Sequence, residues 1–272
     1  MIEARVLLAS PFGFLTGLSL GALGGGGSIL AVPALVYVVG LSATSATATS
    51  LAVVAVTAVW ALSRHHRAGH VRVGPGVVFA AAGIGGSIVG SLLNQRVDPD
   101  VLLLGFAVIM LFAAAGMVRR ARGTPTSGVG LEIADRSEEG TVASKRRIDV
   151  TTVLGVVVGG TLVGFLTGFF GVGGGFVIVP VLVLVLGFSM RDAVGTSLLV
   201  IAISSAIALV PRLGTDAIDP AVTISFTLAA LVGATLGTRV ATRVDPARLV
   251  TWFGALLVAV ALYTGISSLA AL

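Results

Sequence analysis

Long apolar segments separated by short polar stretches constrain the fold of this chain more than any other feature. Ten such segments can be drawn: 6–24, 28–40, 43–63, 74–93, 99–118, 151–172, 174–187, 192–211, 220–240 and 247–269. About 20 apolar residues suffice for a helix to cross the hydrocarbon core of a bilayer. The pattern therefore predicts an all-α, polytopic transmembrane helical bundle.

The charged residues support a membrane protein and argue against other classes. Only 11% of the residues are charged, against about 25% in soluble domains. The net charge of +5 comes from Lys and Arg between the apolar segments, which is typical of cytoplasmic loops rather than of a nucleic-acid surface. The chain has no cysteine, which excludes disulfides, thiol catalysis and thiolate metal sites.

The two halves of the chain are copies of each other. When residues 26–51 are aligned with residues 173–198, thirteen of the 26 positions are identical. The same offset aligns the two RVDP sequences at 96–99 and 243–246. One offset over separated motifs indicates an internal duplication. We therefore expect two repeats of about five apolar segments each, with one short or broken segment per repeat.

A hydrophilic stretch separates the two copies. It contains seven Lys and Arg and five Asp and Glu between residues 119 and 150, which is typical of a solvated linker. The predicted organisation is a first transmembrane repeat over 1–118, a hydrophilic linker over 119–150 and a second transmembrane repeat over 151–272.

The positive charges predict the orientation of the repeats. If the first two segments of each half return the chain to its starting side, the halves insert upside down relative to each other. Fourteen of the 17 Lys and Arg then face one side, against twelve if these segments make a single broken crossing. The positive-inside rule favours the inverted arrangement. The linker is then cytoplasmic and both termini are extracytoplasmic.

Each half carries a glycine run before a short apolar segment that contains Val-Pro, in LGGGGSILAVP and GVGGGFVIVP. A helix over 28–40 or 174–187 is too short to span, so it begins within the membrane. Its first N–H groups lack intrahelical partners and, with the helix dipole, favour an anion. The predicted substrate-binding residues of the two runs are Gly25, Gly26, Gly27, Ser28, Gly173, Gly174 and Gly175.

Two inverted repeats with discontinuous helices are a common basis of alternating access in secondary transporters. Glycine runs in membrane helices also allow close packing between helices or simple kinks. The two copies, each followed by a short segment and a proline, favour binding of a small anion with several oxygens.

A TSL sequence follows in each half and supplies hydroxyl groups. With Ser42 and Ser189 as N-caps, the next helices begin shortly before it. The predicted substrate-binding hydroxyls are those of Thr49, Ser50, Thr196 and Ser197. The alternative is that these side chains satisfy backbone carbonyls or hold helices together.

Acidic residues lie outside the centres of the apolar segments. All 12 Asp and Glu fall in loops, termini or the linker, whereas ion-coupled carriers often use acids within the membrane. We therefore expect neither carboxylate-mediated proton coupling nor a cation or metal carrier. His65, His66 and His70 cluster with arginines but with no nearby acid or thiol. A solvated loop is expected there rather than a metal site.

No feature indicates an enzyme. Ser28 follows glycines, but no histidine lies at a comparable depth to activate it, and the phosphate-binding GxxxxGK pattern is absent. The sequence predicts no catalytic residue, metal or cofactor. The alternative to an anion transporter is a channel-like or structural membrane protein whose glycines only pack helices, or a carrier of another small solute.

The repeated GxGGGxxxVPxL pattern, with TS on the next helix, resembles the sulfite exporter TauE/SafE family. It reads GVGGGFVIVPVL in the second half and LGGGGSILAVPAL in the first, and the resemblance covers nearly the whole chain. It implies a plasma-membrane permease whose substrate is sulfite, an organosulfonate or another sulfur-containing anion. The expected partners are this small anion and the lipid bilayer, with no nucleic acid; the oligomeric state is left open.

Overall fold

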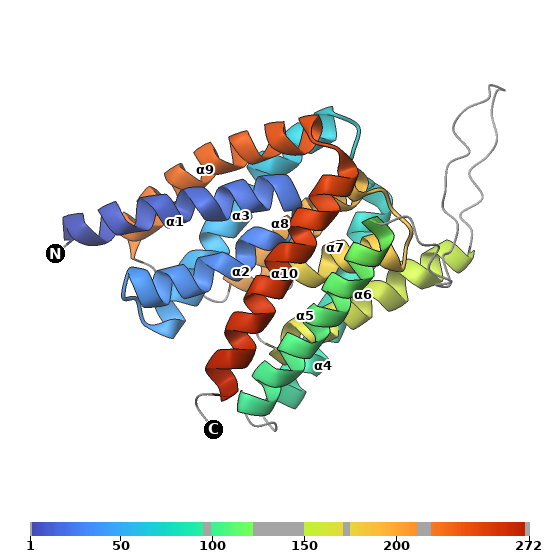
Figure 1. The fold of residues 1–272 in the computed structure, drawn as a ribbon, viewed down its shortest axis with the longest axis horizontal. Helices are drawn as coiled ribbons and strands as arrows, with labels where there is room; N and C mark the ends of the chain where they lie inside the picture. The colour runs from blue at the N-terminus through green and yellow to red at the C-terminus, as the bar shows by residue number, and fades with distance from the viewer. Residues whose placement is uncertain (1, 95–98, 122–149, 171–174, 211–218, 270–272) are drawn as a thin grey trace.

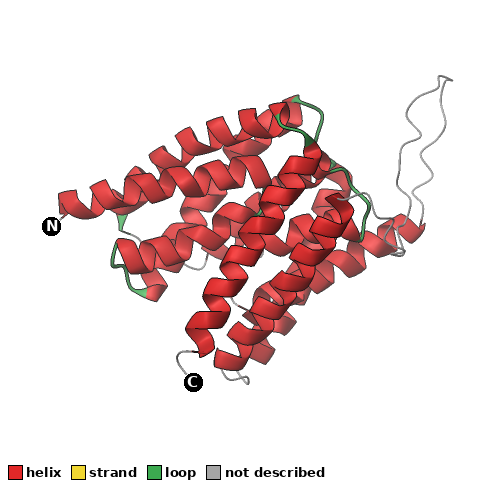
Figure 2. Cartoon of the chain, in the orientation of Figure 1, coloured by secondary structure: helices red, strands yellow, loops and turns green. Residues whose placement is uncertain are grey.

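The computed structural model describes residues 2–94, 99–121, 150–170, 175–210 and 219–269. Over these residues the regular structure is entirely helical, as Figure 2 shows. The predicted all-α class is therefore confirmed. Most of the predicted linker lies outside the described residues, and the proposed division at 118 and 150 stays a prediction.

The helices follow the predicted apolar segments. The first half contains α1 (Ile2–Leu23), α2 (Gly26–Pro33), the short π-helix η1 (Ala34–Val38), α3 (Ala43–Arg67), α4 (Val73–Asn94) and α5 (Pro99–Ala121). The second half contains α6 (Val150–Phe170), α7 (Gly175–Leu184), α8 (Met190–Leu209), α9 (Pro220–Arg243) and α10 (Pro246–Leu269). Over the described residues, five helices are long and apolar enough to cross a membrane: α3, α4, α8, α9 and α10.

Side chains at the predicted positions fix where α3 and α8 begin. The Ser42 hydroxyl oxygen accepts a hydrogen bond from the Ser45 N–H, and the Ser189 hydroxyl oxygen accepts one from the Asp192 N–H, each at 3.2 Å. Both residues are extended and both act as N-caps, which satisfies an otherwise unpaired N–H at each helix start. The predicted N-caps are confirmed.

The short segment of the first half changes geometry after its proline. Pro33 ends α2, and in η1 the Val39 N–H donates to the Ala34 carbonyl at 3.2 Å. This i to i+5 bond is a π-type turn, which often appears where a helix is interrupted. Gly40, with a φ of +75°, then turns the chain toward α3. A side chain rarely adopts this left-handed conformation.

The helices of the two halves pack on each other rather than within one half. The largest helix interfaces join α1 to α9, α4 to α6, α5 to α10 and α3 to α8. Figure 1 shows α1 beside α9 and α5 close to α10. Because α1 corresponds to α6 and α4 to α9 in the repeat, exchanging the halves leaves this set of pairs unchanged. The contacts therefore follow an approximate two-fold relation.

Small residues allow two of these pairs to approach closely. Gly13, Gly17 and Gly21 of α1 lie against the backbone of α9 at Phe226, Ala230 and Ala234, respectively. The contacts advance in the same direction along both helices, so α1 and α9 run parallel. Gly160, Gly164 and Gly168 of α6 meet α4 in the same way, at Phe79, Gly83 and Ser87. Close contact of this kind is typical of small-residue packing in membranes.

The outer surface is apolar, as a lipid-facing surface must be. Large hydrophobic side chains on several helices are more than half exposed, among them Ile88, Phe112, Leu154, Val158 and Leu228. A soluble protein rarely exposes so many large apolar side chains. The molecule is therefore a multi-pass membrane protein.

Candidate substrate site

The broken helices of the two halves meet at their glycines. Gly24, with a φ of +75°, separates α1 from α2, and α7 begins at Gly175. A β-carbon added at Gly25 would collide with the Gly175 carbonyl group. The backbones of Gly25 and Gly175 are therefore in direct contact, which brings the starts of α2 and α7 together.

Of the other predicted glycines, those that the structure describes pack against neighbouring helices. A β-carbon at Gly26 would lie 2.7 Å from the Ser19 hydroxyl oxygen and 2.7 Å from a methyl group of Leu256. Gly27 lies against α1 at Thr16 and Leu20. These two glycines pack on neighbouring helices. Gly173, Gly174 and the side chain of Ser28 lie outside the described part of the chain.

The four predicted hydroxyl residues are all buried, but they differ in what they contact. The Thr196 hydroxyl oxygen accepts a hydrogen bond from the Arg72 N–H at 3.1 Å. The Ser197 hydroxyl donates to the Val194 carbonyl at 2.8 Å. The Thr49 hydroxyl has no partner among the described residues, and Ser50 lines a cavity. The hydroxyls of Thr196 and Ser197 thus bond to the backbone, which agrees with the alternative that these side chains satisfy backbone groups or hold helices together.

A cavity of about 820 Å³ lies between the halves. Its wall comes from α2, η1, α3 and α4 of the first half and from α6, α7, α8 and α10 of the second. Gly175, the first residue of α7, and Ser50 are the predicted site residues that line it. The cavity reaches the surface at Tyr37, Ile88 and Tyr263, which are each more than half exposed.

The cavity wall is apolar with a sparse set of hydroxyl groups. No Asp, Glu, Lys, Arg or His is among the described residues that line it. The hydroxyl residues in the wall are Tyr37, Thr47, Ser50, Ser87, Thr167, Ser204, Ser205 and Tyr263. Polar groups of this number in an apolar wall are typical of small-molecule sites. An oxyanion here would be held by hydroxyl donors and by the positive end of the α7 dipole.

Most of these hydroxyl residues were not predicted from the sequence. Only Ser50 was, because it belongs to the duplicated TSL. The sequence signal for Ser204 and Ser205, in the C-terminal part of α8, is that they are polar residues within an apolar helix. That pattern alone does not separate a cavity-lining serine from one that bonds its own helix.

The family model of Sulfite exporter TauE/SafE matches residues 9–264, nearly the whole chain. The chain belongs to the sulfite exporter TauE/SafE family. A relative from Xylella fastidiosa, named "Probable membrane transporter protein", is 34% identical over 92% of this chain and 91% of its own length. Another of the same name from Haemophilus influenzae is 26% identical over 71% of this chain and 67% of its own length. No solved structure matches.

In this TauE/SafE family member, the histidine cluster differs from the sequence prediction. His65 is only 2% exposed, and its Nε2 donates to the Gly21 carbonyl of α1 at 3.2 Å. His70 and Arg72 both pair with Asp192 of α8. The expectations of a solvated loop around His65 and of no acid near the cluster are wrong. The acid lies 120 residues from Arg72 in sequence, so only the packing of the halves brings it there.

Proposed function

We propose that this transporter carries a small anion, with sulfite, an organosulfonate or another sulfur-containing anion as the substrate class. The observation that carries the proposal is the cavity walled by both halves. It is large enough for such an ion, offers hydroxyl donors, and includes the start of α7. The absence of acidic side chains from its described wall favours an anion over a cation.

The mechanism we propose is alternating access between two halves that insert upside down in the plasma membrane. The antiparallel arrangement of α3 and α8 supports it. The cavity is lined by residues 47–54 of α3 and residues 200–208 of α8, while the chain after the other end of α3 meets the first turn of α8 at Asp192.

A flux assay tests the substrate class. Purified protein in liposomes is offered sulfite, thiosulfate, sulfate, taurine and sulfoacetate, each with and without the same ion preloaded inside. A carrier shows faster uptake when the inside is preloaded, whereas a channel does not. The proposal fails if no member of the panel is transported and none raises the melting temperature.

Substitutions in the cavity connect the flux to the site. We expect Ser50→Ala and Ser205→Ala to lower transport about tenfold, because each loses a hydroxyl that can bond the ion. Ser63→Ala is the matched control on α3, since the Ser63 hydroxyl donates to the Trp60 carbonyl and does not line the cavity. Equal effects at Ser50 and Ser63 would contradict the assignment of the cavity as the substrate site.

A further inference from the structure

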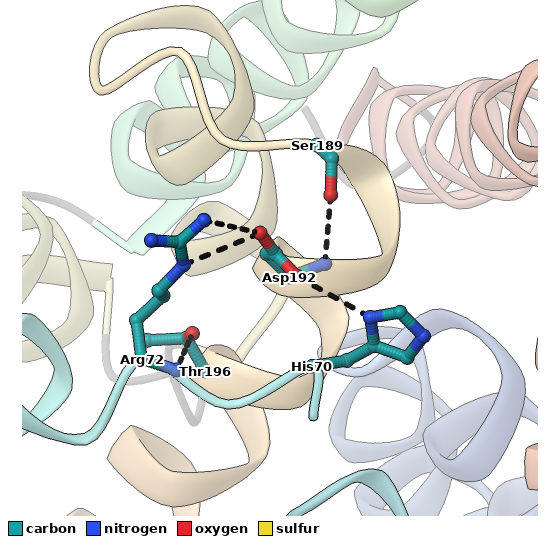
Figure 3. A network of polar contacts seen from close by, with 5 residues as sticks. All are labelled: His70, Arg72, Ser189, Asp192 and Thr196. Carbon is teal, nitrogen blue, oxygen red and sulfur yellow. Dashed lines mark hydrogen bonds and ion pairs between the residues drawn. The ribbon is translucent and has the colours of Figure 1, made fainter. Parts of the chain in front are cut away.

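A carboxylate held between a guanidinium group and an imidazole joins the halves at one end of the α3·α8 pair. Figure 3 shows Asp192, in the first turn of α8, between His70 and Arg72 of the loop that precedes α4. Arg72 donates from Nη2 and Nε to one carboxylate oxygen, at 3.1 and 3.3 Å. The Nδ1 atom of His70 lies 3.4 Å from the other oxygen. Both carboxylate oxygens are thus engaged.

The backbone holds this network in position. The Arg72 N–H donates to the Thr196 hydroxyl oxygen, and Ser189 caps the N–H of Asp192. Gly195 has no side chain, which allows the His70 carbonyl to lie against α8. The Asp192 side chain is 15% exposed, whereas that of Arg72 is 53% exposed. The carboxylate is largely enclosed, and the guanidinium group can be reached from outside.

The network lies at the opposite end of α8 from the cavity. The cavity begins at Val200, about two helical turns beyond Asp192, or ~12 Å along the axis. Buried Thr196 and Ser197 fill the interval. The contact that Asp192, His70 and Arg72 make between the halves therefore lies beyond this end of the cavity.

The chemistry of the network is that of an anion site. A guanidinium group and an imidazole N–H bind carboxylate, sulfite, sulfate and phosphate oxygens through the same charge-assisted hydrogen bonds. The cavity wall offers no cationic side chain among its described residues. Arg72 thus offers a guanidinium group, and His70 an imidazole, beyond this end of the cavity, and the Asp192 carboxylate occupies both.

We propose that Arg72 and His70 form an oxyanion-binding gate, in which the Asp192 carboxylate takes the place of the substrate and keeps this end closed. The inference rests on the proposed function, because it needs an anionic substrate. An oxyanion that reaches Arg72 and His70 replaces the carboxylate. The side-chain contact of Asp192 with Arg72 and His70 is then lost, and this loss lets the end open.

The repeat does not carry a second gate of this kind. The offset of 147 places Ser45 at the position of Asp192, Ala217 at that of His70 and Asp219 at that of Arg72. Asp219 instead caps α9, accepting hydrogen bonds from the Ala221 and Val222 N–H groups. In this proposal, oxyanion control of this kind therefore acts at one end of the transport path.

Binding of sulfate to the purified full-length protein tests the proposal. Asp192→Asn removes the competing charge but keeps the side-chain shape, so we expect sulfate to bind about fivefold more tightly than to the native chain. The double variant Asp192→Asn with Arg72→Gln should lose this gain. Asp219→Asn is the control, since asparagine also caps helices, and it should leave sulfate binding unchanged.

A second readout follows the gate without any substrate. The natural chain has no cysteine, so Ser205→Cys places a single thiol in the cavity. We expect an impermeant maleimide, added on the Arg72 side, to label this thiol severalfold faster in the Asp192→Asn background than in the native or Asp219→Asn background. The same maleimide added on the opposite side is the folding control. Labelling of Ser205→Cys from that side at the native rate shows that the Asp192→Asn protein is folded.

The outcomes separate the gate from the proposed function. Unchanged sulfate binding in Asp192→Asn, a gain that persists without Arg72, or unchanged labelling would each overturn the gate. Failure of the proposed function appears elsewhere, as the absence of flux for the whole anion panel with the native protein. If the variants show the expected sulfate binding and labelling but the native protein transports no anion of the panel, the gate is supported and the substrate is another oxyanion.

Discussion

At the residue scale, Thr49 and Thr196 occupy equivalent positions of the repeat but have different surroundings. Both are fully buried. The Thr196 hydroxyl accepts from the Arg72 N–H, whereas the Thr49 hydroxyl has no partner among the described residues. The Thr196 hydroxyl holds α8 to the loop at Arg72, whereas the Thr49 hydroxyl is unpaired among the described residues, and burial of an unpaired polar group costs free energy.

The same substitution at these two positions should have opposite effects on stability. Thr196→Val leaves the Arg72 N–H without its acceptor, so we expect unfolding to become easier by about 1–3 kcal/mol. Thr49→Val removes an unpaired hydroxyl at nearly constant volume, so its effect should be neutral or stabilising by less than about 1 kcal/mol. Denaturation in detergent measures both. Equal destabilisation would show that Thr49 has a partner in the protein.

Ser50 and Ser197 show why only part of the candidate site follows from the sequence. The duplicated TSL indicates polar groups within apolar helices, and of its residues Ser50 lines the cavity. The helix position of Ser197 does not reveal that its hydroxyl turns to its own helix at Val194. That choice depends on which helix covers each face, which a single sequence does not state.

At the element scale, the glycines of the first run are not equivalent. A β-carbon at Gly25 meets the backbone of α7, which cannot give way, whereas one at Gly26 meets the ends of the Ser19 and Leu256 side chains. We expect Gly25→Ala to destabilise the protein by about 3 kcal/mol or more and Gly26→Ala to yield folded protein. Detergent-solubilised yield and melting temperature measure the difference.

A control for the glycine variants exists on α4. A β-carbon at Gly85 meets nothing within 4 Å, so Gly85→Ala should be neutral or stabilising by about 0.5–1 kcal/mol, the usual helix preference for alanine. If Gly25→Ala behaved like Gly85→Ala, the contact between the starts of α2 and α7 would not exist.

The interface between α4 and α6 should be as sensitive as the glycine run. Gly164 of α6 lies against the backbone of Gly83, and a β-carbon there would collide with it. We expect Gly164→Val to separate the two helices and to give aggregated protein in size-exclusion chromatography. Gly85→Val, on the open face of α4, should elute as the native protein does. A monodisperse Gly164→Val would contradict the close approach of α4 and α6.

Element positions followed from the sequence because each apolar segment ends at a clear polar or glycine boundary. Ser42 and Ser189 begin α3 and α8 as predicted. The π-helix after Pro33 was not predicted, since a proline in a helix is compatible with several local geometries of the chain around it.

At the scale of the whole molecule, the duplication predicted two similar halves, and the helix pairs follow their two-fold relation. The sequence did not predict that these pairs form between the halves, because single-sequence patterns carry no information on contacts across long separations. The orientation in the membrane stays a prediction based on the positive charges and supported by the directions of α3 and α8.

Reporter fusions test this orientation. We expect alkaline phosphatase fused to either terminus to be active and green fluorescent protein fused there to be dark, because both termini are predicted to be extracytoplasmic. Insertion of either reporter after residue 135, within the linker, should give the reverse pattern. A cytoplasmic C-terminus would rule out the inverted arrangement.

The interleaved helix pairs also bear on how this protein is made. Since α1 packs on α9 and α4 on α6, the ribosome finishes the first half before the glycine faces of α1 and α4 have these partners. Until the second half is inserted, those faces are exposed to lipid or covered by the insertion machinery. The two-fold set of pairs also means that an ancestral half would form the same interfaces with a second copy of itself.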